Sequence, residues 1–340
     1  MSDEFKKVTI YDIAQAAGVA YSTVSTVLSG NRKNYLSEKT RSRILALAEE
    51  MNYIPSHANR ILKGIKTNTA AIVISSPAMA EQEHIRSIIL RLTEKLRIHE
   101  YAAYVSYFLP DCDRSHEIRK LIQRGCDAFY FASSIQEYSH LCDEITGHGK
   151  TYVTYGYASP RSITVDITGG VTEILKSFIG SGRNNFRMIM PAHDMNENDR
   201  AAALRTVFPD RPFEEVHRRY VVSDDSRPYN PEKYDTALYF ETGYKLTQKA
   251  LTDDPGIQAF FYFSDHYAAG GIRALSEAGI KPIKDVLIAG VNNTQISQFG
   301  NPPFTSIGYD IEAVVDAVVD NLFGNEPVSI NTRPVIYWRQ

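Results

Sequence analysis

The sequence predicts an all-α N-terminal unit followed by a two-lobed α/β unit, whose parallel sheets carry helices on both faces. Two short helical patterns separated by a glycine open the chain at residues 9–28. From residue 70 onward, strand and helix patterns alternate, which is typical of βαβ units and a parallel sheet. The alternation restarts near residue 162, so we expect two lobes of similar order within the 340 residues.

The N-terminal patterns indicate a helix-turn-helix over residues 1–54. Thr9 suits an N-cap and can form a capping box with Asp12. Apolar residues then recur at helical spacing until Gly18, which ends the helix and supplies the tight turn. A second helix is predicted for residues 21–28, with hydroxyl side chains opposite its apolar face, and Ser37 is expected to cap a third helix.

Residues 55–68 are expected to form a hinge helix and a linker. Pro55 suits the first turn of a helix and Gly64 suits its end. The segment between them is shorter than the roughly 12–15 residues that an isolated helix needs in water, so we expect a partner to order it. Leu62 has no evident core to join, and a leucine presented in this way can wedge into a minor-groove step of DNA.

The charge is unevenly distributed along the chain. Residues 1–66 contain ten Lys and Arg against six Asp and Glu, a net charge of +4, whereas the remainder contains 27 against 34, a net charge of −7. A basic N-terminal unit is what phosphate binding requires. No apolar run is long enough to span a membrane, and the N-terminus lacks the apolar core of a secretory signal. The three widely spaced cysteines suit a reducing compartment. We therefore expect a cytoplasmic protein.

The α/β unit is expected to cover residues 69–340. The predicted strands are 70–75, 102–108, 127–132, 150–156, 186–190, 220–222, 258–263, 285–291, 305–309 and 334–339. The predicted helices are 83–99, 114–124, 136–146, 168–181, 196–207, 236–252, 265–278 and 310–324. We expect the chain to cross between lobes near 164, 294 and 327, which gives an N-lobe of about 69–164 and 295–326 and a C-lobe of about 165–294 and 327–340. The stretch 220–233 is expected to be largely surface loop.

Three stretches resemble the LacI/GalR family of bacterial transcription regulators: V-T-I-Y-D-I-A-x-x-A-G-V at residues 8–19, T-V-S at 23–25 and N-Y-I-P at 52–55. Looser similarity continues through DITGG, SDHYAAG and DVLIAGVNN. The resemblance implies a periplasmic-binding-protein-like effector domain behind the helix-turn-helix. This chain departs from common family residues at Ala20, Thr26 and Asn59, and has Asn292 where many sugar-responsive relatives have Asp.

The candidate DNA-binding residues lie in the first two helices, after them and in the hinge. The resemblance implies that Tyr21, Ser22 and Thr26 read base edges and that Leu62 enters the minor groove. Hydroxyls and a tyrosine at the start of a short helix suit the donors and acceptors of the major groove. The full set is Thr9, Tyr11, Tyr21, Ser22, Thr23, Ser25, Thr26, Asn31, Arg32, Tyr53, Asn59, Arg60 and Leu62.

The candidate effector-binding residues stand at strand ends, which meet around one cleft in parallel sheets. They are Ser75, Ser76, Asp166, Ser264, Asp265 and Asn292. Arg200 is added because it lies at the start of a predicted helix where the resemblance implies a ligand-contacting arginine. Arginine, carboxylates and amides together suit a polyhydroxylated ligand. Asp265 can instead be a helix N-cap and Asn292 a turn residue. Aromatic residues in the strands are expected to pack sheet against helix, and lone histidines such as His84, His140 and His266 are expected at the surface or at helix caps.

These observations predict a homodimeric, sequence-specific repressor that binds a pseudo-palindromic operator in double-stranded DNA and responds to a small, sugar-like effector. No cofactor, metal or membrane partner is expected, and the absence of heptads after the last strand favours a dimer over a tetramer. A regulator controlled by a corepressor or a partner protein is the main alternative. A solute-binding protein and an enzyme are further alternatives, but the helix-turn-helix argues against the first, and no catalytic motif supports the second.

Overall fold

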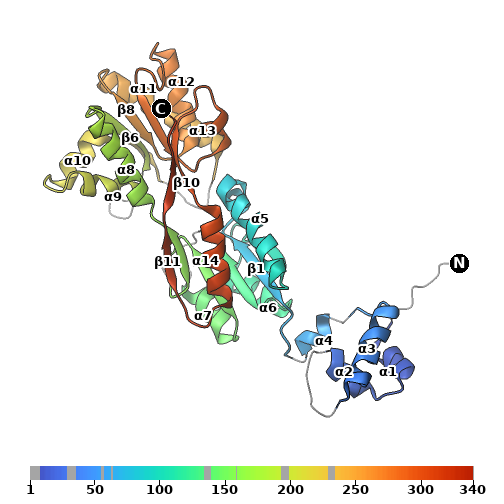
Figure 1. Cartoon of the computed structure of the whole chain (residues 1–340). Coiled ribbons are helices and arrows are strands. Elements are labelled where there is room, and N and C mark those ends of the chain that lie inside the picture. Colours follow the sequence, from blue (N-terminus) through green and yellow to red (C-terminus); the bar gives the residue numbers. More distant parts are fainter. Residues whose placement is uncertain are drawn as a thin grey trace. The chain divides into compact units, whose positions relative to one another are not determined.

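The computed structural model describes residues 8–28, 36–54, 57–62, 64–133, 139–157, 159–192, 199–228 and 234–339. The chain forms two compact units, Met1–Thr67 and Asn68–Gln340 (Figure 1). Among the described residues, no helix combines the length and the apolar composition needed to cross a bilayer. The predicted fold class is confirmed: helices make up the first unit, and two largely parallel sheets with helices make up the second.

The first unit is built on three helices: α1 (Ile10–Ala17), α2 (Tyr21–Leu28) and α3 (Glu38–Glu50). The expected capping box begins α1, since the Thr9 amide donates to Asp12 Oδ2 at 2.7 Å and the Asp12 amide donates to Thr9 Oγ1 at 3.4 Å. Gly18 ends α1 in the left-handed region, with φ 64°. The helices enclose one small core, formed by Ile13, Ala14, Ala17, Val24, Val27, Ile44 and Ala48.

A short fourth helix, α4 (His57–Leu62), follows in the same unit. Pro55, Ser56 and Lys63 lie outside the described residues. The helix ends where the Gly64 amide donates to the Ile61 carbonyl at 3.0 Å, and Gly64 has a φ of 64° that favours glycine. Leu62 leaves 84% of its surface exposed, so α4 offers an apolar side chain that is not used in packing.

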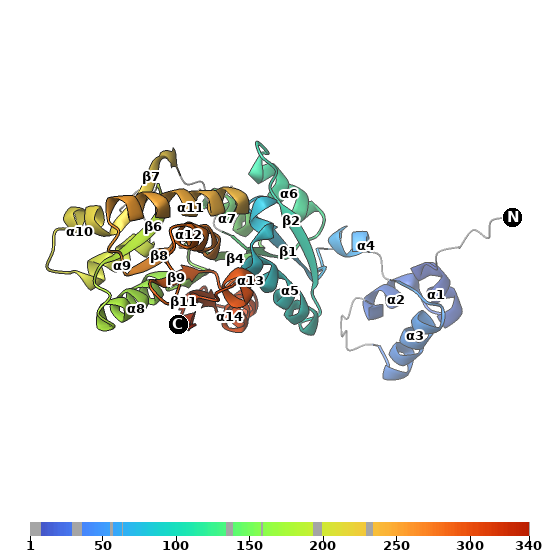
Figure 2. The same ribbon diagram turned by 90° about the horizontal axis from the view of Figure 1, so that it is seen from above.

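The first lobe of the second unit is a six-stranded, all-parallel sheet in the order β11-β5-β4-β3-β1-β2. Helices α5 and α6 cover opposite faces of this sheet (Figure 2). Buried strand residues alternate between the two sides, with Ile72 and Tyr130 toward α5 and Val73 and Phe131 toward α6. The elements are β1 (Thr69–Ile74), η1 (Ala78–Glu81), α5 (Glu83–Ile98), β2 (Ala102–Tyr107), α6 (Arg114–Gln123), β3 (Ala128–Phe131), α7 (Ser139–Gly147), β4 (Thr151–Tyr155), β5 (Ser162–Val165), α14 (Ile311–Phe323) and β11 (Ser329–Thr332).

The second lobe repeats this plan with the strand order β12-β10-β9-β8-β6-β7. Only the β10–β12 pair of this sheet is antiparallel. Its elements are α8 (Ile167–Gly180), β6 (Phe186–Ala192), α9 (Asp199–Val207), α10 (Phe213–Tyr220), β7 (Val221–Pro228), α11 (Thr236–Asp253), β8 (Ala259–Tyr262), α12 (Asp265–Glu277), β9 (Leu287–Val291), α13 (Gln295–Phe299), β10 (Thr305–Tyr309) and β12 (Pro334–Tyr337). Both sheets therefore direct the carboxyl ends of their parallel strands toward one interlobe region.

Two of the three expected crossings between lobes are wrong. The chain leaves the first sheet after β5, close to the expected position 164, but it returns between β10 and α14, not near 294. It crosses again between β11 and β12 at Arg333, not near 327. Strand β10 therefore belongs to the second lobe and β11 to the first, because each pairs with the sheet of that lobe.

The expected surface loop at 220–233 is wrong for its first part, because Val221–Pro228 forms β7 at the edge of the second sheet. Residues 229–233 lie outside the described residues. Helix α10 was also not expected. Its apolar residues Phe213, Val216 and Tyr220 do recur at helical spacing, and Val216 and Tyr220 are buried, so the sequence carries a signal for this short helix that our prediction did not use.

Helices α11 and α12 approach each other closely at glycines. A Cβ on Gly270 would lie 2.0 Å from the Phe240 carbonyl oxygen, and a backbone atom cannot move aside as a side chain can. We therefore expect Gly270→Ala to reduce the free energy of unfolding by about 2–3 kcal/mol or more, as overpacking does. Gly180→Ala, in α8 with open space around its Cβ position, is the matched control. Chemical denaturation that gives equal stabilities for both variants would contradict this packing account.

Candidate functional site

The exposed face at the start of α2 carries two aromatic rings. Tyr11 and Tyr21 stack with their centroids 5.1 Å apart and an interplanar angle of 17°. Both side chains remain exposed, at 65% and 47% respectively. The stack therefore lies at the surface beside the N-terminal turn of α2, a position from which side chains can reach a nucleic-acid groove.

The hydroxyl residues of α2 differ in exposure. Ser22 is exposed, whereas Thr23, Ser25 and Thr26 are half-buried. The Thr26 hydroxyl donates to the Ser22 carbonyl oxygen at 2.8 Å. This bond uses the hydroxyl proton of Thr26, so that Thr26 does not donate that proton to a base, whereas its methyl group can contact a thymine methyl.

The remaining candidates fall into three groups. Tyr53 packs against the core of the first unit, and burial raises the pKa of its phenol. The Arg60 guanidinium donates through Nε to the Lys66 carbonyl oxygen at 2.9 Å, which ties α4 to the segment after it. Asn31 and Arg32 lie outside the described residues, and so does the side chain of Asn59.

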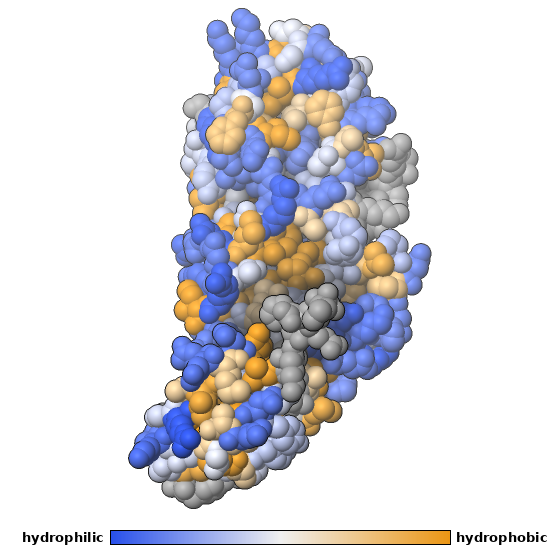
Figure 3. Space-filling model, turned by 90° about the vertical axis from the view of Figure 1, so that its right-hand side faces the viewer, coloured by the Kyte–Doolittle hydropathy of each residue, from blue (hydrophilic) through white to orange (hydrophobic). Residues whose placement is uncertain are grey.

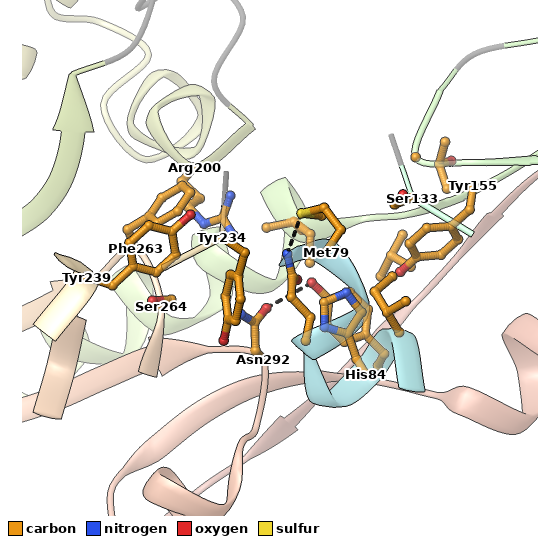
Figure 4. Close-up of a pocket in the computed structure, with 17 residues that line it drawn as sticks. Met79, His84, Ser133, Tyr155, Arg200, Tyr234, Tyr239, Phe263, Ser264 and Asn292 are labelled. Carbon is orange, nitrogen blue, oxygen red and sulfur yellow. Dashed lines mark hydrogen bonds between the residues drawn. The ribbon is translucent and has the colours of Figure 1, made fainter. Parts of the chain in front are cut away.

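A cavity of about 240 Å³ lies between the two lobes (Figure 4). Arg200, Tyr239 and Phe263 of the second lobe stand on one side of it, and His84 and Tyr155 of the first lobe stand on the other. The lining residues are Met79, Gln82, His84, Ile85, Ser133, Tyr155, Gly156, Thr164, Val165, Ile167, Arg200, Tyr234, Tyr239, Phe263, Ser264, Asn292 and Tyr309. None of these lining residues is acidic, and many are aromatic, a composition typical of small-molecule sites.

Three of the seven candidate effector residues line this cavity. The Arg200 guanidinium lies 4.2 Å from the centroid of the Phe263 ring, close enough for a cation–π contact. Ser264 caps α12 through the Tyr267 amide. Asn292 adopts a φ of 99°, and its Oδ1 accepts a hydrogen bond from the Tyr309 hydroxyl at 3.1 Å. Asn292 is therefore both a turn residue and part of the cavity wall.

The other four candidates do not line the cavity. Ser75 is buried and accepts from the Ser133 hydroxyl at 2.8 Å, so it positions a lining residue. Ser76 accepts from the Met79 amide at 3.3 Å. Asp166 caps α8 by accepting from the Gly169 amide at 2.8 Å. Asp265 is fully buried, and neighbouring segments saturate its carboxylate, so the expected ligand contact is wrong for it.

The Asp265 carboxylate joins three segments of the second lobe. It accepts from the Thr294 amide at 2.7 Å and from the Thr294 and Ser306 hydroxyls at 3.0 and 2.7 Å. Burial raises its pKa to about 7, against the opposing effect of these hydrogen bonds. The loop after β9, which presents Asn292 to the cavity, is thus fixed to the start of α12.

The raised pKa of Asp265 predicts a specific pH dependence of stability. Between about pH 4 and pH 7 the native protein keeps a proton that the unfolded chain has lost, so this group makes stability fall as pH rises through that window. We expect Asp265→Asn to remove this contribution. Denaturant unfolding at pH 5 and pH 8 should show the wild type losing more stability than the variant. Parallel pH profiles would contradict a raised pKa.

His84 is the lining residue that the sequence pattern misplaced. It is only 9% exposed, and its ring stacks on Tyr309 with centroids 4.2 Å apart. Burial and then the positive charge of Arg200 lower the pKa of His84 to about 3. The expectation of a surface or cap position is wrong for it, whereas His140 is exposed as expected. The aromatic lining residues were likewise assigned to packing, and nothing in the local sequence distinguishes them.

Comparisons with known proteins match both units. Residues 9–56 match the model described as bacterial regulatory proteins, lacI family, and residues 175–327 match a periplasmic binding protein-like domain. The chain is 26% identical to the HTH-type transcriptional regulator DegA of Bacillus subtilis (strain 168), over 90% of this chain and 88% of that protein. It is 22% identical to the lactose operon repressor of Escherichia coli (strain K12), over 93% and 84% of the two chains.

Two solved structures share the fold over nearly the whole chain. The lac repressor dimer bound to operator and the anti-inducer ONPF has a TM-score of 0.75 and 19% identity, and covers 98% of each chain. The complex of the transcriptional regulator CelR with cellobiose has a TM-score of 0.63 and 19% identity, over 98% of this chain and 99% of that chain. At these identities the likeness establishes the fold.

Proposed function

Since this chain belongs to the lacI family of bacterial regulatory proteins, we propose that it is a dimeric transcriptional repressor gated by a small sugar or sugar derivative. The observation that carries the proposal is the joining of two units in one chain. A helix-turn-helix unit presents an exposed tyrosine stack and hydroxyls, and a two-lobed unit holds a cavity between its lobes. A ligand that binds one interlobe arrangement better than another shifts the affinity for operator DNA by linkage.

The chemistry of the cavity supports a polyhydroxylated effector. Hydroxyl, amide and guanidinium groups among its lining residues can bind several hydroxyls at once. The aromatic rings offer faces against which the apolar side of a sugar ring can pack. The volume of about 240 Å³ lies below the roughly 300–1,000 Å³ of drug-sized pockets, which favours a small ligand.

Association into a dimer is supported by exposed apolar side chains on the first lobe. Leu90 and Ile98 on α5 are more than half exposed, and Val105 and Tyr107 on the edge strand β2 are about half exposed. Figure 3 views the molecule from the side on which α5 lies in Figure 1, and hydrophobic side chains interrupt its hydrophilic surface there. Exposed apolar surface of this kind marks interaction sites, and a second copy would also pair two helix-turn-helix units for a pseudo-palindrome.

The proposal is tested by selecting an operator from random double-stranded DNA with the purified protein, and then titrating sugars into the complex. We expect a pseudo-palindromic consensus, and one sugar that changes operator affinity at least tenfold. Failure to select any sequence would overturn the DNA-binding part. A selected operator whose affinity no small molecule changes would favour control by a partner protein.

Base reading by α2 gives a further prediction. Because arginine pairs with guanine in the major groove, Thr26→Arg should change the bases preferred in each half-site. Arg41→Ala should weaken binding to all sequences alike and reduce its dependence on salt, as loss of a phosphate contact does. Repeating the selection with both variants checks this, and an unchanged consensus for Thr26→Arg would refute the assignment.

A further inference from the structure

His84 connects the two lobes across the cavity. It lies on α5 of the first lobe, and its ring stacks on Tyr309, which ends β10 of the second lobe. The Tyr309 hydroxyl in turn donates to Asn292 at the end of β9. Figure 4 shows His84 and Asn292 close together, and Tyr309 contacts both of them, His84 through its ring and Asn292 through its hydroxyl. This wall of three side chains is continuous, although it is assembled from both lobes.

The imidazole of His84 is not satisfied within this wall. Its Nδ1 atom is buried and has no hydrogen-bond partner among the residues that the structure describes. Arg200 lies on the opposite side of the same cavity; burial and then the Arg200 charge lower the pKa of the imidazole, which therefore stays neutral. A neutral imidazole has one donor and one acceptor nitrogen, and a buried polar atom without a partner destabilises the protein. Since His84 lines the cavity, a ligand held there lies beside its imidazole.

We propose that the imidazole of His84 binds a hydroxyl of the effector and thereby couples effector binding to the contact between the lobes. This inference deepens the proposed function and rests on it. A hydroxyl can donate to one imidazole nitrogen or accept from the other, so an uncharged sugar satisfies His84 in either tautomer. The same ligand reaches Asn292 and Tyr309 from the second lobe, so the bound sugar links the lobes through hydrogen bonds that the free protein lacks.

The test separates this role from ordinary packing. His84→Phe keeps a flat ring that can stack on Tyr309 but removes both nitrogens. We expect the sugar-free variant to be as stable as the wild type or more stable in thermal unfolding, while its affinity for the sugar falls at least tenfold in calorimetry. His84→Asn, whose amide can replace Nδ1, should recover most of that affinity. The probes are glucose, lactose and cellobiose.

Tyr130→Phe provides the matched control. The Tyr130 hydroxyl is also buried without a partner among the described residues, but it does not line the cavity. Its removal should preserve or raise stability without changing sugar affinity. Equal sugar affinity in the wild type and His84→Phe would overturn the inference and leave the proposed function standing. If none of the three sugars binds the wild type, the sugar assignment fails, and this inference fails with it.

Discussion

Replacing Leu62 with alanine is expected to weaken operator binding at least tenfold, which corresponds to about 1.4 kcal/mol. The side chain is 84% exposed and contributes nothing to the packed cores, so its truncation should leave stability unchanged. It stands at the end of α4, a helix of six residues that is too short to be stable alone. An exposed leucine in such a helix can insert between base steps and kink DNA.

Fluorescence anisotropy and a gel-shift bending assay measure both consequences of the Leu62 change. Leu45→Ala, at another exposed leucine on α3 of the same unit, controls for the general loss of apolar surface and should bind normally. Sugar affinity should be the same in all three proteins. An unchanged affinity and bend angle in Leu62→Ala would exclude the wedge role.

Local sequence signals predicted the local structure well. Thr9, Asp12 and Gly18 determine where α1 begins and ends, and all three act through bonds within a few residues of the chain. The alternation of strands and helices likewise predicted two parallel sheets. Capping and periodicity are short-range properties, so a single sequence is sufficient to reveal them.

Long-range pairing was not predictable in the same way. The hydrophobic pattern of β10 predicted a strand but did not specify which sheet it joins, and β11, with the sequence SINT, was not predicted as a strand at all. Pairing with β9 or with β5 decides which sheet each strand joins, and those strands are distant in sequence. The crossings at 294 and 327 were wrong for this reason.

In the candidate site, too, local signals were predictable from the sequence and long-range contacts were not. Asp265 follows a strand in the position of a ligand-binding carboxylate, but Thr294 and Ser306 from other segments saturate it. His84 carries no local signal, since its burial depends on Tyr309 of the opposite lobe. Arg200 was identified through the family resemblance and Asn292 through its place after a strand, and each lies at the cavity.

Replacing Arg200 with alanine is expected to abolish the response of operator binding to the sugar. The guanidinium lines the cavity and packs over Phe263, so alanine removes both a multiple hydrogen-bond donor and one wall of the site. The cavity belongs to the second unit and the DNA-binding surface to the first. We therefore expect the operator affinity of the sugar-free variant to stay within about threefold of the wild type, or ~0.65 kcal/mol.

Arg205 supplies the matched control for Arg200. It lies on the same helix, α9, and its guanidinium packs 4.0 Å from the centroid of the Phe213 ring, but it does not line the cavity. Arg205→Ala should therefore lose a comparable cation–π contact and still respond to the sugar. Operator titrations of both variants, with and without sugar, measure how much the sugar changes the operator affinity of each. A full response in Arg200→Ala would contradict the assignment of the effector to this cavity, because alanine removes the only Arg or Lys side chain among the described lining residues.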